Sequence, residues 1–391
     1  MTVVPEPTSP VPASPEPAPP AQPASPDLVS PAQPASPEPA PPAQPASPDL
    51  VAPNPAPPRP AFPALASRAQ PALPGFTSRA QPALPGFTSR AQPALPGFTS
   101  PEPVFLEPAD WQPLHAAHAL RVDALLADHL ARRSRGEKHP VEDFLFTYYP
   151  TRPKQLRLWH PGPGLALRGA TQYEGKRGYL YSEGAARLDP TEITRRADSI
   201  TWIAQLLKAT SGRQPQFGCF GLHEWAMVYR TEEIRHDWPL RLGSTGTDQV
   251  VESHKIACSH FDAFRFFTTP ARPLNLLQPT RESQPALEQG GCLHANMDLY
   301  KWSTKLMPFT PSSLLLDCFE LARDIRTLDM RASPYDFAAL GYEPIEIETP
   351  TGKAQYAAAQ RTFADRARPL RLQLADLCDR LLQEAAAPVT S

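Results

Sequence analysis

The chain has 391 residues, with 38 basic and 40 acidic side chains and a formal net charge of −2. This balance argues against a general nucleic-acid-binding surface, although it leaves room for a local basic patch. The N-terminus has neither the basic nor the apolar part of a signal peptide, and no apolar run approaches the ~18 residues of a membrane helix. Five cysteines without a Cys-x-x-Cys pair favour a reduced protein, so the sequence predicts a cytoplasmic protein without a membrane partner.

Residues 1–104 are a Pro/Ala-rich segment of repeats. They contain 32 of the 53 prolines and lack Cys, His, Trp and Tyr. One sixteen-residue unit occurs at 14–29 and 36–51, and one eleven-residue unit occurs at 67–77, 78–88 and 89–99. Such a composition cannot bury enough apolar surface to offset its ordering entropy, so we expect a disordered, polyproline-rich tail. A docking arm for a proline-recognising partner of unknown identity and a translation start near residue 104 are alternatives.

Helix signals dominate residues 105–385, which we expect to form a mainly α (α+β) fold, as one domain or as two lobes. Residues 386–391 are expected to be a disordered C-terminus. Apolar spacing predicts an early helix over 112–131. A second helix is expected from Asp189, where an N-cap residue, a proline and a glutamate stand at the spacing of a helix start.

Further helix starts are predicted where a capping residue precedes a proline, at Thr310, Ser333 and Thr349. Pro369 is expected to kink the last of these helices or to split it. Strand signals are fewer, and they predict short strands at 165–167, 178–181, 256–260 and 264–268. We therefore expect a small sheet among helices.

Histidine and cysteine are concentrated in three stretches, 218–225, 258–262 and 292–298, which we expect to straddle the sheet and its flanking helices. In the first, His223 and Glu224 would stand at the start of a helix. They would act there as a metal ligand and a general base, or His223 would cap the helix and Glu224 would interact with its dipole. Met227 replaces the second histidine of a zincin motif, which excludes that motif.

The other two stretches offer a metal site or an acid–base pair. His260, Asp262 and His294 follow the order of a two-histidine, one-carboxylate site that suits Fe²⁺. Alternatively, His294 and Asp298 would form an ordinary pair on one helix face. Cys219, Cys258 and Cys292 match no zinc spacing and are expected to be buried structural residues, although they could add thiolate ligands.

A basic segment rich in aromatic residues, 131–177, carries ten Lys or Arg against four acids. Basic side chains interleaved with rings suit a nucleic-acid backbone and stacked bases, whereas a solvated helix end with core aromatics is the alternative. The candidate backbone contacts are Arg132, Arg133, Arg135, Arg152, Lys154 and Arg157.

Five blocks, 139–150, 217–230, 258–267, 284–302 and 328–336, resemble a family of bacterial proteins labelled 3-methyladenine DNA glycosylase. The resemblance covers roughly residues 106–385. No catalytic residue carries over by motif, because the chain has neither a glycine-rich helix–hairpin–helix followed by an aspartate nor the zinc-ligand pattern of the small 3-methyladenine glycosylases. The site residues below therefore come from residue chemistry.

The resemblance implies an N-glycosylase that binds DNA, excises an alkylated purine and requires no cofactor. An N3-alkylated adenine is cationic, so its glycosidic bond is weak, and the enzyme needs stacking rings and a carboxylate. Candidate rings are Tyr148, Tyr149, Trp225, Phe261, Tyr300 and Trp302. Candidate catalytic groups are His223, Glu224, His260, Asp262, His294 and Asp298.

Two other functions remain open from the sequence. One is an Fe- or Zn-dependent enzyme that acts on a small molecule. Its metal ligands would come from His223, His254, His260, Asp262 and His294. The other is a non-catalytic interaction protein whose repeat segment is the binding arm.

Overall fold

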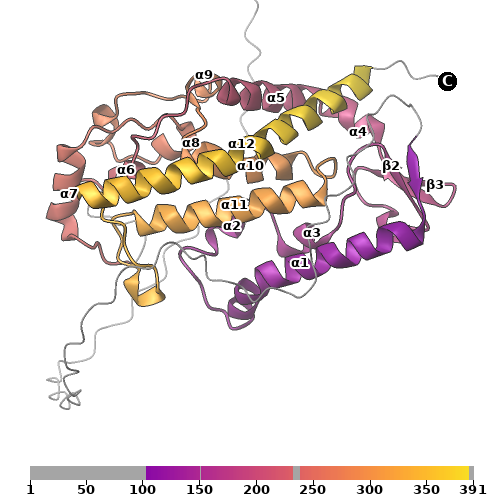
Figure 1. Cartoon of the computed structure of the whole chain (residues 1–391), viewed down its shortest axis with the longest axis horizontal. Coiled ribbons are helices and arrows are strands. Elements are labelled where there is room, and N and C mark those ends of the chain that lie inside the picture. The colour runs from indigo at the N-terminus through magenta and orange to yellow at the C-terminus, as the bar shows by residue number, and fades with distance from the viewer. Residues whose placement is uncertain (1–102, 150, 232–237, 387–391) are drawn as a thin grey trace, which may run out of the picture. The chain divides into compact units, whose positions relative to one another are not determined.

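The computed structural model describes residues 103–149, 151–231 and 238–386 (Figure 1). Their structure is mainly helical with one small four-stranded sheet, as the sequence predicts. The repeat segment predicted at 1–104 and the C-terminus predicted at 386–391 lie almost wholly outside the described residues. No helix within the described ranges is long and apolar enough to cross a membrane.

The sheet comes from the first part of the described chain. Its strands are β1 (Val104–Leu106), β2 (Leu165–Arg168), β3 (Tyr179–Ser182) and β4 (Ala185–Leu188), in the order β1-β2-β4-β3. β1 runs parallel to β2, and the other pairs are antiparallel. The β3–β4 hairpin turns at Glu183 and Gly184, whose φ values of 51° and 74° are those of a type I′ turn. A small core that includes Trp111, Trp159 and Tyr173 packs beside the strands.

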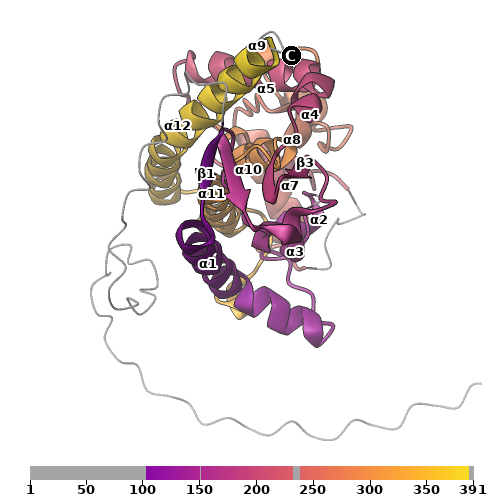
Figure 2. The same ribbon diagram turned by 90° about the vertical axis from the view of Figure 1, so that its right-hand side faces the viewer.

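The remaining elements are helices. In the described ranges they are α1 (Pro108–Ser134), α2 (Phe144–Thr147), α3 (Pro153–Arg157), α4 (Pro190–Arg195), α5 (Ala197–Ser211), α6 (Leu222–Ala226), α7 (Gly243–Ser253), α8 (Phe261–Phe264), α9 (Gln284–Leu287), α10 (Leu293–Lys305), α11 (Ser312–Arg331) and α12 (Pro350–Ala386), with short 3₁₀ turns at Thr171–Tyr173, Arg272–Leu274 and Ala338–Leu340. Figures 1 and 2 place the sheet at one end of the long helices α10, α11 and α12, and Figure 1 places α6 and α7 toward the other end.

The main core is built around α10. This helix packs against both α11 and α12, and α12 also packs along α5. Most side chains of α10 are buried, including Met297, Leu299 and Tyr300 at 0 % exposure. A helix that is buried almost all round can place polar residues deep inside the protein, so α10 is the element that positions the candidate site.

Three helix starts follow the local signals read from the sequence. The Asp189 carboxylate accepts a hydrogen bond from the Thr191 amide at 2.9 Å, and Pro190 occupies the first turn of α4. The hydroxyl of Thr349 accepts from the Gly352 amide at 3.0 Å at the start of α12. The third start, that of α11, follows Pro311.

Two predicted strands are wrong. Residues 264–268 contain the end of α8 and a turn, and within 256–260 only Ile256 forms a bridge, to Asn275. The physical reason is a side chain: the Asn275 amide accepts from the Cys258 N–H and donates to the Cys258 carbonyl, which replaces a strand partner. The sheet therefore ends before residue 189, and the histidine-rich stretches lie among helices rather than across it.

Three helix predictions also need correction. No α-helix starts at Ser333, because its hydroxyl donates to the Met330 carbonyl at 2.7 Å and closes the end of α11. Of the two outcomes expected at Pro369, a kink or a split, the split does not occur, because α12 is one helix over 37 residues. The helix expected from Asp189 is two helices, since Arg196 leaves helical geometry between α4 and α5.

Candidate functional site

The three histidine-bearing stretches meet inside the protein. The rings of His223 and His294 pack edge to face with centroids 4.4 Å apart. His294 also stacks against His260, at 5.3 Å between centroids. These residues come from α6, the first turn of α10 and the residue before α8, so tertiary packing alone brings them together.

His223 and Glu224 lie in α6, as predicted, and a strained turn leads into this helix. Phe220 and Gly221 have φ values of 48° and 72°, so the chain reverses sharply just before it. The indole of Trp225 donates to the Ala332 carbonyl at 2.8 Å and anchors α6 to the end of α11. This anchor holds His223 against Asp329 of α11, with Nε2 and Oδ1 2.9 Å apart.

A compact group of four potential metal ligands results. One ligand atom each from His223, Glu224, His294 and Asp329 lies within 4.8 Å of all the others. Arg326 pairs with both carboxylates, at 3.3 Å from Glu224 and 3.5 Å from Asp329. We call these four residues the inner cluster.

Electrostatic coupling in the inner cluster is strong. Burial alone would lower the pKa of His223, but the adjacent Asp329 carboxylate raises it well above its usual value. Burial raises the pKa of Glu224, and the charge of Asp329 adds to that rise. The pKa of His294 is lowered by burial and by His223.

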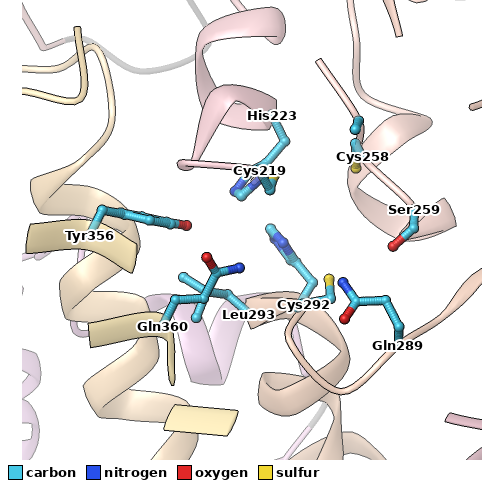
Figure 3. A pocket seen from close by; sticks show the side chains of 11 residues that line it. Cys219, His223, Cys258, Ser259, Gln289, Cys292, Leu293, Tyr356 and Gln360 are labelled. Carbon is cyan, nitrogen blue, oxygen red and sulfur yellow. The ribbon is translucent and has the colours of Figure 1, made fainter. Parts of the chain in front are cut away.

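A small cavity adjoins the inner cluster (Figure 3). Its volume is about 10 Å³, which is room for about one water molecule or one ion. His223, His294, Tyr356 and Gln360 line it, together with Cys219, Cys258 and Cys292. Burial raises the pKa of both the Cys258 and the Cys292 thiols, so these two cysteines are protonated. We call this space the inner cavity.

A second charged cluster lies on the other side of His260. His260 Nε2 lies 3.3 Å from Glu288 and 3.4 Å from Asp298. Lys301 bridges Asp298 and Asp262, at 2.9 and 2.7 Å. Asp298 also accepts a hydrogen bond from the Tyr149 hydroxyl at 2.8 Å.

This second cluster reaches an open pocket of about 510 Å³. Its rings are Tyr148, Tyr149, Trp202 and Trp302, its carboxylate is Asp262, and its cations are Arg265, Arg281, Lys301 and Lys305. We call it the aromatic pocket. Burial opposes ionisation of Asp262, but Lys301 more than compensates, so the pKa of this carboxyl is lowered and the group is charged at neutral pH.

A third hollow, of about 440 Å³, shares Thr304 and Lys305 with the aromatic pocket. Its charged side chains are Lys176, Arg177, Glu192, Arg196 and Lys305. Four cations against one carboxylate suit an anionic ligand such as a phosphodiester. We call it the cationic pocket.

No family model, curated protein or solved structure matches the chain. The function is therefore inferred from the geometry of the described residues.

The structure distributes the predicted site residues unevenly. Tyr148, Tyr149, Asp262 and Trp302 line the aromatic pocket. Phe261, which is part-exposed, has the guanidinium of Arg281 4.9 Å from its ring centroid. Trp225 and Tyr300, by contrast, are 0 % exposed in the main core and line none of the three hollows.

The histidines and carboxylates do not form the predicted combinations. Asp298 is on α10 with His294, but it contacts His260 and Lys301 instead. His260, Asp262 and His294 do not belong to one four-ligand group, because Asp262 faces the aromatic pocket. His254 lines none of the hollows, and its Nδ1 bonds the Val250 carbonyl.

The candidate backbone contacts fall into two groups. Arg132, Arg135 and Arg157 form ion pairs with Glu142, Glu137 and Asp123, at 2.5, 2.7 and 2.8 Å. Arg133, Arg152 and Lys154 are exposed. Arg152 and Lys154 belong to the turn that carries Gln155, which lines the cationic pocket.

Several site residues were not predicted from the sequence, among them Trp202, Glu288, Lys301, Arg326, Asp329 and Tyr356. A signal existed for Asp329: it stands four residues after Ile325 on an apolar helix face and lies between Leu328 and Met330, so burial of a charge was readable. Its partner was not readable, because 106 residues separate it from His223.

Proposed function

We propose that the protein is an N-glycosylase that excises an alkylated purine from DNA and binds the extruded base in the aromatic pocket. The observation that carries the proposal is the pocket itself: aromatic walls around a buried, ionised carboxylate, Asp262. The resemblance read from the sequence points to the same chemistry.

The dimensions of the aromatic pocket suit one nucleoside. A volume of about 510 Å³ falls within the range of ordinary small-ligand sites. Trp302 holds the ammonium groups of Lys301 and Lys305 4.6 and 5.6 Å from its ring centroid. Because four cations and one carboxylate line the pocket, its rings rather than a net negative charge would hold the alkylated purine, by stacking.

Asp262 would supply the chemistry. When the glycosidic bond breaks, its electron pair goes to the alkylated purine, which leaves as the neutral base. The positive charge passes to an oxocarbenium-like sugar, which an adjacent carboxylate stabilises while water attacks and loses its proton. Lys301, Arg265 and Arg281 lie 2.7 to 3.3 Å from Asp262 and keep it ionised. Tyr149, Asp298 and His260 support Lys301 from behind and would act as positioning residues.

The cationic pocket would hold the DNA backbone. It adjoins the aromatic pocket through Lys305, so a phosphate there would lie close to the extruded nucleotide. Phosphate contacts position a nucleic acid without reading its sequence. This local arrangement reconciles DNA binding with a net charge of only −2.

The deciding experiment measures release of free 3-methyladenine from methylated duplex DNA by the full-length protein. We expect Asp262→Asn to lower the rate at least about 100-fold. Asp317→Asn is the matched control, because Asp317 is also paired with an arginine, 2.7 Å away, but lies outside the pockets. Base release no faster than in a protein-free reaction, or full activity of Asp262→Asn, would refute the proposal.

A binding measurement distinguishes recognition from chemistry. A duplex that carries a pyrrolidine abasic-site analogue imitates the cationic sugar, so wild-type protein should bind it more tightly than unmodified duplex. Asp262→Asn should lose this preference and retain the affinity for unmodified duplex. Equal affinity of the wild type for both duplexes would contradict the role of Asp262.

A further inference from the structure

The inner cavity is walled by polar groups that have no partner. Among the described residues that line it, the hydroxyl of Tyr356 and Oε1 of Gln360 are buried and make no hydrogen bond. The residues that carry them are 0 to 1 % exposed. Leaving such a group unsatisfied costs about 1–3 kcal/mol, so two that line one cavity indicate a missing guest.

His294 strengthens this indication. Its only ring partners in the described chain are two other imidazoles, those of His223 and His260. Figure 3 shows the Tyr356 hydroxyl and the Gln360 amide directed toward the same central space as the imidazole of His223. The cavity volume of about 10 Å³ limits the guest to about one small particle.

The donors beside the cavity select the kind of guest. The inner cluster offers two imidazoles and two carboxylates, whose ligand atoms lie within 4.8 Å of one another. This mixture of nitrogen and oxygen donors suits Zn²⁺, Fe²⁺ or Mn²⁺ better than Mg²⁺ or Ca²⁺, which prefer oxygen alone.

The charge of the inner cluster points the same way. Glu224 and Asp329 carry two negative charges, and Arg326 carries one positive charge. The carboxylates therefore outnumber the one permanent cation, which leaves a net attraction for a metal ion when both imidazoles are neutral, as metal ligands must be. Isolated buried charge is costly unless it is paired or coordinates a metal.

We propose that His223, Glu224, His294 and Asp329 bind one divalent transition-metal ion beside the inner cavity, which His223 and His294 line. Because the cavity has room for about one small particle and no substrate, the ion would be structural. It would join α6, α10 and α11 at the point where their polar residues meet. The proposal does not rest on the glycosylase activity, since the aromatic pocket uses none of these four residues.

Cys219 has a different role in this arrangement. Its Sγ lies 3.5 Å from Nδ1 of His223, whereas Nε2 of the same ring faces Asp329. A thiol on the far nitrogen orients a ligating imidazole, as second partners of metal-bound histidines commonly do. The expected ligand set is therefore nitrogen and oxygen without sulfur.

The test measures metal content in full-length protein expressed separately with added Zn²⁺, Fe²⁺ or Mn²⁺. We expect about one equivalent of one metal in the wild type, and loss of most of it in His294→Ala and Asp329→Asn. His118→Gln is the control: this buried histidine bonds the Leu156 carbonyl away from the cavity and should leave metal content unchanged.

A second measurement keeps the proposal testable if the variants do not fold. Removing metal from the wild type with a chelator should lower its melting temperature by several degrees, and adding Zn²⁺, Fe²⁺ or Mn²⁺ should restore it. Two results together would overturn the proposal and leave water as the guest: a metal content below about a tenth of an equivalent per protein in every preparation, and a melting temperature that none of these metals changes.

The absorption spectrum of the Co²⁺-substituted protein identifies the ligand atoms. The Co²⁺-substituted wild-type protein should show visible absorption bands without an intense near-ultraviolet thiolate band. An intense thiolate band that disappears in Cys219→Ser would overturn the assigned nitrogen and oxygen ligand set. DNA glycosylase activity is no part of this readout, so either proposal can fail alone.

Discussion

His260 stacks on His294 with 5.3 Å between ring centroids and 25° between ring planes. This contact joins the inner cluster to the ion pairs that end at Asp262. Buried titratable side chains are therefore continuous from the inner cavity to the aromatic pocket. A change of charge at one end can alter the electrostatic potential at the other, because water screens buried charges only weakly.

Replacing Lys301 with Met should destabilise the protein at neutral pH. Asp298 and Asp262 would lose the cation between them. Arg265 and Arg281 would still pair with Asp262, but Asp298 would keep no lysine or arginine partner in the described chain, and breaking a buried pair costs about 3–5 kcal/mol. The carboxyls would then have raised pKa values in the folded state, so the stability deficit should shrink as the pH falls toward 5. Urea denaturation at pH 8 and pH 5 measures both effects.

Lys305→Met is the control for that variant, since Lys305 is an exposed lysine of the same helix without a carboxylate partner among the described residues. It should change the free energy of unfolding little at either pH. Equal losses in the two variants would show that the ion pairs of Lys301 contribute nothing.

His160 should make the protein acid-sensitive. Burial, followed by the charge of His118, lowers the pKa of His160 to about 4. Between pH 6.5 and pH 4 the unfolded chain takes up a proton at this position and the folded protein does not, so stability falls as pH falls. His160→Gln removes this dependence: the wild type should lose about 3 kcal/mol more than the variant between pH 7 and pH 4. Parallel stability curves would contradict the shift.

Trp202 should contribute to base binding. This part-exposed ring lines the aromatic pocket, edge to face with Trp302 at 5.3 Å. Loss of one stacking partner costs about 1–3 kcal/mol, so Trp202→Ala should weaken the affinity for duplex DNA that carries 3-methyladenine roughly tenfold, measured as the KM of base release. Trp238→Ala, a part-exposed tryptophan that lines none of the hollows, should leave the affinity unchanged.

Lys176 and Arg177 should contact phosphates. Substituting both with Gln should reduce the slope of log affinity against log salt concentration by about 2, because each neutralised phosphate contributes about 0.9. The measurement is a fluorescence anisotropy titration of duplex DNA over a range of salt concentrations. Arg368→Gln, at an exposed position of α12, should leave the slope unchanged, and an unchanged slope in the double variant would place the DNA elsewhere.

Gly352 should tolerate no side chain. A Cβ there would lie 2.0 Å from the carbonyl oxygen of Glu346, so the first turn of α12 would have to move. Gly352→Ala should lower the free energy of unfolding by more than about 2 kcal/mol. Gly218→Ala meets no atom within 4 Å and serves as the control; similar midpoints of urea denaturation would contradict the clash.

Much of the helical framework was predictable because its signals are local. Asp189 and Thr349 cap helices with their own side chains, within a few residues of sequence. The strand predictions failed where a distant side chain intervened, as Asn275 does at Cys258. Strands β1 and β4 were missed because three or four residues are too short to show an alternating pattern.

The candidate site was predictable in its residue types and not in its pairs. The density of histidine near residues 223, 260 and 294 correctly indicated that these stretches meet. The pairing of Asp298 with Lys301 follows from helix spacing and could have been read. The pairing of His223 with Asp329 depends on how α6 docks on α11, which no local rule specifies.

Tyr356 and Gln360 are the contribution of α12 to the inner cavity, and nearly all other walls come from residues 219–294. When this helix is displaced, the hollow has an open side. An ion would therefore enter or leave the folded protein only when α12 opens locally. Metal exchange should then proceed at the rate of local unfolding rather than of simple dissociation.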